Sequence, residues 1–146
     1  MFEIIAKVEI KPTEDEGKVR IALENIFDFE KIEVIEEFGS KYYVAKSYSL
    51  KSLNKIANSI KKQRIELTAR SILEKSIENN YLSFKLNKQA AYMNRISFVT
   101  VEGEATLGAI EIKIISDNPL KIIDTIAPLP KIYRSTKSEN EKSLER

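Results

Sequence analysis

The sequence has 146 residues with 24 basic and 22 acidic side chains, a formal net charge of +2, and 42% hydrophobic residues. A chain of this length buries about two thirds of the surface that it exposes when unfolded, so one ordinary domain is expected. The absence of His and Cys excludes Ser-His-Asp and Cys-His nucleophilic sites, the usual zinc sites, haem ligation and disulfides. We therefore predict no cofactor, and a bound metal would have to be a hard ion with oxygen ligands, such as Mg²⁺.

The N-terminal residues and the hydropathy pattern predict a cytoplasmic protein with no membrane partner. Glu3 stands where a signal peptide would carry positive charge. No apolar run approaches the roughly 18 residues that a membrane-spanning helix needs.

Hydrophobic periodicity divides residues 1–130 into strands and helices. Alternation from Phe2 to Ile10 is typical of a half-buried strand, and similar patterns predict strands at 31–38, 41–48, 81–86, 95–101 and 106–115. Apolar residues three and four apart predict helices at about 14–27, 50–64, 65–79 and 119–127. The join at 61–64 fits either a break or one continuous helix.

Local signals place the ends of several of these elements. Thr13 and Glu16 have the spacing of a capping box, Gly39-Ser40 suits a tight hairpin turn, and Asn118-Pro119 starts the last helix. The resulting order is β-α-β-β-α-α-β-β-β-α, which predicts an α+β fold: a two-layer arrangement of an antiparallel sheet with helices packed on one face. We expect a single domain over 1–130 and a polar, disordered tail over 131–146.

The near-neutral net charge conceals a strong segregation along the chain. Residues 1–37 carry 5 basic and 11 acidic side chains, whereas residues 38–100 carry 12 basic and 3 acidic ones, a net charge of +9. An asymmetry of this size indicates a surface for a polyanion, unless the fold interleaves the segments and cancels the field.

Two basic segments are the candidate binding residues. The first lies at the helix junction, where several cations on one face would neutralise phosphates and Arg adds bidentate geometry. The second connects two predicted strands and adds amides for base edges or sugar hydroxyls, with Tyr92 as a stacking ring. Together they supply the predicted RNA-binding residues Lys61, Lys62, Arg64, Arg70, Lys85, Asn87, Lys88, Gln89 and Arg95.

Each candidate also has a purely structural interpretation. Lys61 and Lys62 are favourable charges at a helix C-terminus. Asn87 suits the cap of a helical turn that Asn94 would close, with Tyr92 and Met93 packed on the core.

The acidic residues Glu14, Asp15 and Glu16 are candidate magnesium ligands, but acids in the first turn of a helix are also what its dipole favours. Three acids within one helical turn cannot all point at one ion. A magnesium-dependent nuclease is therefore the last-ranked hypothesis, and we predict no metal and no catalytic residue. The four glycines are isolated from one another, which excludes a glycine-rich phosphate loop.

Four segments stand out together: Pro12–Asp15, Arg64-Ile65 with Ala69-Arg70, Phe84–Ala91, and Leu107-Gly108 with Ile110. Their order and spacing resemble a small archaeal family of predicted RNA-binding proteins and proposed exosome subunits. The resemblance covers about residues 2–130, and Asn-Lys-Gln-Ala-Ala is its most specific part. It implies a two-layer α/β fold like that of the large-subunit ribosomal protein that binds five-S RNA. This chain departs from the family pattern by having Leu67, preceded by Glu66, where the pattern has Asp; a catalytic or metal role of that Asp would be absent here.

These observations favour a non-catalytic RNA-binding protein that contacts phosphates through residues 61–70 and 85–95, as an accessory in RNA processing. The alternative is a protein-interaction or assembly module whose basic segment docks an acidic partner, or the acidic 1–37 segment of another copy. Either hypothesis allows a monomer or a homodimer.

Overall fold

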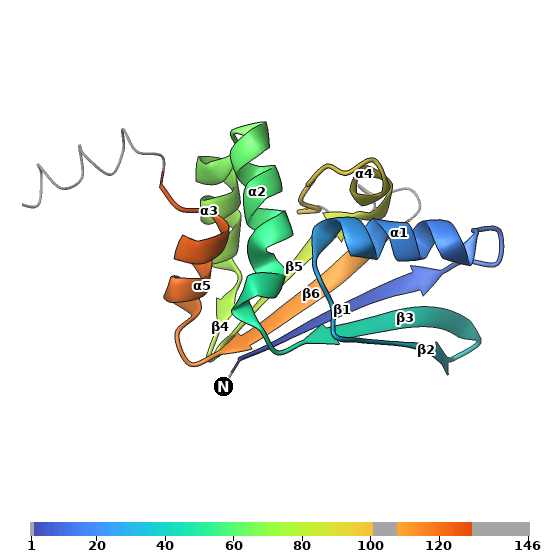
Figure 1. Cartoon of the computed structure of the whole chain (residues 1–146). Helices are drawn as coiled ribbons and strands as arrows, with labels where there is room; N and C mark the ends of the chain where they lie inside the picture. The colour runs from blue at the N-terminus through green and yellow to red at the C-terminus, as the bar shows by residue number, and fades with distance from the viewer. Residues whose placement is uncertain (1, 101–107, 130–146) are drawn as a thin grey trace, which may run out of the picture.

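The structure, a computed structural model, describes residues 2–100 and 108–129. Within these ranges it is a two-layer α+β arrangement, which confirms the predicted fold class. Figure 1 shows the helices gathered above one face of a twisted sheet, with the other face uncovered. The predicted tail, 131–146, lies outside the described residues, as do 101–107.

The described strands form one antiparallel sheet in the order β2-β3-β1-β6-β5-β4. Its central strand β1 pairs with β3 on one side and β6 on the other, so the N-terminal residues hold the middle of the fold. The strands are β1 (Phe2–Ile10), β2 (Lys31–Glu37), β3 (Ser40–Ser47), β4 (Ile77–Glu78), β5 (Tyr81–Asn87) and β6 (Ala109–Ser116).

The helices lie on one side because each presents a single apolar stripe to the sheet. Ala22, Leu23 and Ile26 of the first helix, for example, are each 1% exposed or less. Strand residues on the same side, such as Ile4 and Ile112, complete the core. The described helices are α1 (Glu16–Ile26), the 3₁₀ helix η1 (Leu50–Leu53), α2 (Asn54–Gln63), α3 (Glu66–Lys75), α4 (Lys88–Tyr92) and α5 (Pro119–Ile126).

The predicted capping box of the first helix is wrong. Residues 11–14 form a turn closed by a bond from the Glu14 backbone nitrogen to the Lys11 oxygen, so α1 begins later. Asp15 is its cap, and its Oδ1 accepts hydrogen bonds from the backbone nitrogens of Gly17 at 2.7 Å and Lys18 at 3.4 Å. The hairpin turn is displaced by one residue from the predicted pair, because Phe38 (φ 51°) and Gly39 (φ 78°) take the two positive-φ positions.

The predicted strand at 95–101 is also wrong in its described part, 95–100. Residues 97–99 make only a short contact with β5, through the bonds Asn87 N to Ser97 O at 2.8 Å and Val99 N to Lys85 O at 2.9 Å. A two-residue strand that was not predicted, β4, occupies the other end of the same edge of β5. The edge is thus divided between two short segments, and neither extends along all of it.

Candidate nucleic-acid interface

The junction between α2 and α3 is a break in the chain direction, which resolves the open question at residues 61–64. Arg64 ends α2 in the left-handed conformation (φ 58°, ψ 42°), and the Ile65 nitrogen donates back to the Ile60 oxygen at 3.2 Å. This bonding closes the helix as in a Schellman motif, where Gly or Asn is the usual residue. Arg64 therefore holds its guanidinium at an exposed, sharply turned corner.

Gln63 fastens this corner to Ile96, 33 residues later in the chain. Its Nε2 donates to the Ile96 oxygen at 2.9 Å, and its Oε1 accepts from the Ile96 nitrogen at 2.7 Å. The two bonds hold the neighbouring Arg95 beside the end of α2, although the two segments are distant in sequence. Asn94 (φ 63°) makes the turn that leads into this contact.

The result is a cluster of four exposed cations, which we call the junction cluster: Lys61, Lys62, Arg64 and Arg95. None of the four forms an ion pair with a carboxylate among residues 2–100 and 108–129. Residues 61–70 contain one acid, Glu66, so this part of the chain provides little local neutralisation. The structure thus brings together the ends of the two predicted basic segments.

A groove of about 580 Å³ lies beside the cluster, between α3 and residues 95–100. Its walls combine apolar side chains with Gln63, Thr68 and Arg95. Guanidinium and ammonium groups with no carboxylate partner among the described residues are suited to phosphate oxygens, and the polar groups beside them are suited to sugar hydroxyls.

Most other cations of the basic segment are neutralised by the fold. Lys41 pairs with Glu16 at 2.7 Å and Lys55 with Asp28 at 3.0 Å, so carboxylates of the acidic 1–37 segment compensate them. The hydrogen bond to Glu16 raises the pKa of Lys41 above its ordinary value. Among the described residues, the basic side chains of this segment therefore stay without carboxylate partners at only a few places, and the junction cluster is one of them.

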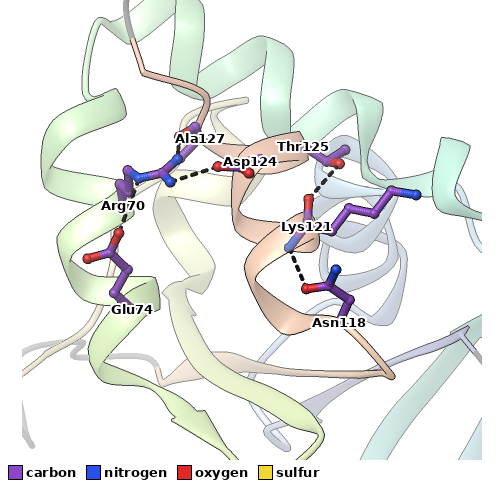
Figure 2. Close-up of polar contacts among 7 residues, drawn as sticks. All are labelled: Arg70, Glu74, Asn118, Lys121, Asp124, Thr125 and Ala127. Carbon is purple, nitrogen blue, oxygen red and sulfur yellow. Dashed lines mark hydrogen bonds and ion pairs between the residues drawn. The ribbon is translucent and has the colours of Figure 1, made fainter. Parts of the chain in front are cut away.

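Arg70, another predicted RNA-binding residue, is engaged within the chain and is not part of the junction cluster. Its guanidinium is enclosed by Asp124 at 2.7 Å, Glu74 at 3.1 Å and the Ala127 oxygen at 3.2 Å, and its side chain is 17% exposed. Figure 2 shows these contacts joining α3 to α5. Arg70 thus fastens two helices together, and its predicted contact with a phosphate stays a prediction.

Lys88, a further predicted RNA-binding residue, is buried and does not lie on the surface. Its Nζ donates to Glu14 Oε1 and to the Glu9 oxygen, each at 2.8 Å, and the residue is 3% exposed. Asn87 caps α4 by accepting from the Ala90 nitrogen at 3.0 Å, which confirms the structural interpretation of this residue.

The remaining predicted residues are dispersed over the molecule. Lys85 lies on the open face of the sheet, 3.7 Å from Glu111. Gln89 lines a separate cleft of about 480 Å³ between α1 and α4, together with Tyr92 and Met93. These last two side chains are 40% and 69% exposed, so the expectation that they pack on the core is wrong.

The three acids proposed as magnesium ligands point to different partners. Glu14 accepts from Lys88 and from the Lys11 nitrogen, Asp15 caps α1, and Glu16 pairs with Lys41. Among the described residues no three acids lie close enough together to hold a metal ion. No helix in those ranges is long and apolar enough to cross a membrane.

Sequence reasoning missed the residue that assembles the cluster, Gln63. Its role depends on a backbone partner 33 residues away. A helix-terminal Gln carries no local signal for such a contact, whereas the cations around it were visible in the composition.

Comparison with known proteins places the chain in a family. A family model described as RNA binding matches residues 3–115. A UPF0201 protein of Sulfurisphaera tokodaii is 41% identical over 128 residues, which are 88% of each chain, and one of Sulfolobus acidocaldarius is 39% identical over the same share. The chain belongs to the UPF0201 family. This confirms the prediction that the chain belongs to an archaeal family whose model is described as RNA binding.

Solved structures of UPF0201 proteins have the same fold. The crystal structure of the UPF0201 protein from Methanococcus jannaschii shares 38% identity with a TM-score of 0.75, over 88% of this chain and 95% of that one. A more distant protein from Archaeglobus fulgidus, at 20% identity and a TM-score of 0.60, shares the fold alone. The predicted exosome association and the likeness to a ribosomal protein are tested by none of these comparisons and stay predictions.

Proposed function

We propose that this protein binds RNA without catalysing a reaction on it, and that the junction cluster contacts the phosphate backbone. The observation that carries the proposal is the cluster itself: four exposed cations, drawn from two distant segments, with no carboxylate partner among the described residues. Membership of a family described as RNA binding supports the same ligand. The occupied carboxylates of residues 14–16 support a non-catalytic role.

Phosphate contacts account for most of the affinity in complexes of this kind and carry no sequence information. The cluster is therefore expected to bind different RNA sequences with similar affinity. The resemblance seen in the sequence extends the proposal to an accessory role in RNA processing.

Charge reversal at the cluster tests the proposal. We expect Arg64→Glu with Arg95→Glu to weaken binding of a fluorescein-labelled RNA duplex by about tenfold or more, measured by anisotropy at low salt. The matched control is Lys51→Glu with Lys75→Glu. It makes the same change in net charge at η1 and at the end of α3, away from the junction.

An equal loss of affinity in both double variants would mean that total charge, and not the cluster, governs binding. No binding of any RNA by the parent protein would refute the proposed function. It would leave the alternative, a basic surface for an acidic protein partner. The form of that alternative in which another copy docks through its acidic 1–37 segment is less favoured, because Glu14, Glu16 and Asp28 of that segment form ion pairs within the chain.

A further inference from the structure

The uncovered face of the sheet has an organised surface that the junction cluster does not use. Alternation along the strands sends residues such as Ile5, Lys46 and Lys113 to this face, while their neighbours Ala6, Ala45 and Ile112 point into the core. Helices of the described chain cover only the opposite face (Figure 1). Among the described residues, no helix covers the side chains of this open face.

Three lysines lie in one line across this face, which we call the lysine row. The register pairs Lys31 with Lys46, Lys46 with Ile5, and Ile5 with Lys113, so the line crosses β2, β3, β1 and β6. Adjacent strands are about 4.8 Å apart, so the row is about 14 Å long. Among the described residues none of the three lysines forms an ion pair with a carboxylate.

The row on one side carries Glu3 in line with Ile115 and Tyr81, and the row on the other side has the opposite character to the lysine row. There Lys7 pairs with Glu37 at 3.1 Å and Lys85 with Glu111 at 3.7 Å, so its cations are compensated. In the lysine row, Lys31 and Lys46 are instead direct cross-strand neighbours of like charge, an arrangement that destabilises a sheet. An anion laid along the row would relieve this repulsion.

Tyrosine rings stand at both ends of the lysine row. The Lys31 Nζ lies 5.8 Å from the centre of the Tyr48 ring, and the Lys113 Nζ lies 4.3 Å from the centre of the Tyr81 ring. Tyr48 is 47% exposed and lines a hollow of about 570 Å³ with Lys31 and Lys46, whose walls also include the acidic side chains of Glu30 and Glu33. Between the rings, the half-buried Ile5 adds an apolar surface at the centre of the row.

We propose that the lysine row binds single-stranded RNA, with phosphates on the lysines and unpaired bases on Tyr48 and Tyr81. Cations that follow a backbone, combined with aromatic rings that stack bases, are the usual means of binding single strands. A duplex keeps its bases stacked inside and gives no face to the rings. This inference rests on the proposed function, since it names the form of RNA that a second surface of the same protein recognises.

The full-length protein with Lys31→Gln, Lys46→Gln and Lys113→Gln tests this inference. Fluorescence anisotropy is measured with a labelled 12-nucleotide oligouridine and with a labelled 16-base-pair duplex, at several salt concentrations. For the single strand we expect about tenfold weaker binding and a salt slope smaller by about 2, because three cations no longer neutralise phosphates. Duplex affinity is expected to change by less than about twofold, because the junction cluster binds the duplex.

The matched control, Lys7→Gln with Lys51→Gln and Lys75→Gln, makes the same change in net charge, with one lysine from the compensated row of the same face and two on helices. It is expected to leave single-strand affinity within about twofold of the parent. Tyr48→Leu keeps the apolar bulk and removes the aromatic ring, and is expected to weaken single-strand binding about fivefold or more. It provides a second readout that does not depend on charge.

The possible outcomes separate this inference from the proposed function. Unchanged single-strand affinity in the triple variant would overturn the lysine row while leaving duplex binding at the junction cluster intact. Absence of all RNA binding by the parent would overturn both. Displacement of the oligouridine by a polyglutamate peptide of equal charge, at equal concentration, would also overturn the inference, because it would show a general polyanion surface without base stacking.

Discussion

Lys88 provides the sharpest test of how the fold uses its charges. It is the only charged residue that is fully buried in the described chain, and its Nζ donates to Glu14 Oε1 and to the Glu9 oxygen. The Glu14 side chain is 12% exposed, so both ends of this ion pair are withdrawn from water. Lys88→Met keeps the apolar stem and leaves that carboxylate without its counter-charge.

The expected decrease in stability follows from these interactions. Removing one partner of a buried pair costs about 3–5 kcal/mol, because the remaining charge stays desolvated. The Glu9 oxygen is also deprived of its charged donor, although the Lys11 nitrogen still donates to Glu14 at 2.9 Å. We therefore expect the free energy of unfolding to fall by about 3 kcal/mol, at the lower end of that range.

Urea denaturation followed by circular dichroism measures this decrease. The control is Lys85→Met, three residues earlier, where the side chain is 56% exposed and faces Glu111 at 3.7 Å. We expect this control to change stability by less than about 0.5 kcal/mol. Equal effects of the two substitutions, or an RNA affinity lowered by Lys88→Met in protein that is still folded, would refute a purely structural role of Lys88.

Three further predictions concern the junction, the ion pairs between helices and a tyrosine. Arg64→Gly should raise the free energy of unfolding by about 0.5–1 kcal/mol, because Gly accepts the left-handed conformation, and should weaken RNA binding in the same sample; denaturation and anisotropy measure the two. Arg70→Leu should destabilise by about 1–2 kcal/mol with RNA affinity unchanged, since its partners are half exposed and solvent screens part of the attraction. The hydrogen bond to Glu78 at 2.5 Å raises the pKa of Tyr81, so the stability that this bond provides is present below the ordinary tyrosine pKa and disappears as the pH rises above it; Glu78→Gln should shift that tyrosine's ultraviolet titration to lower pH.

The alternating and helical patterns of apolar residues predicted most of the fold, because they show which side of each strand and helix is buried. They failed where interactions distant in sequence decide the local structure. The start of α1 differs from the prediction because Glu14 is drawn into the pair with Lys88, 74 residues away. The segment 95–100 has the pattern of a strand, but Gln63 holds Ile96, and only residues 97–99 contact β5.

Only part of the candidate site could be predicted, again because some of its interactions join residues that are distant in sequence. Exposed cations at a helix end, Lys61, Lys62 and Arg64, were recognisable from charge alone. The burial of Lys88 was not, since lysine is almost never buried unless it is paired, and its partner lies on another element. The lysine row was not predicted because its members come from three strands and only the register of the sheet aligns them.

The salt dependence of RNA affinity tests the central claim most directly. The logarithm of the binding constant of a duplex is measured against the logarithm of salt concentration for the parent, for Arg64→Gln with Arg95→Gln, and for Lys51→Gln with Lys75→Gln. If the junction cluster neutralises phosphates, the slope of the first variant falls by about 2, close to 1 for each cation removed, and that of the second is unchanged. A slope that is the same in all three proteins would contradict the assignment of RNA binding to this cluster.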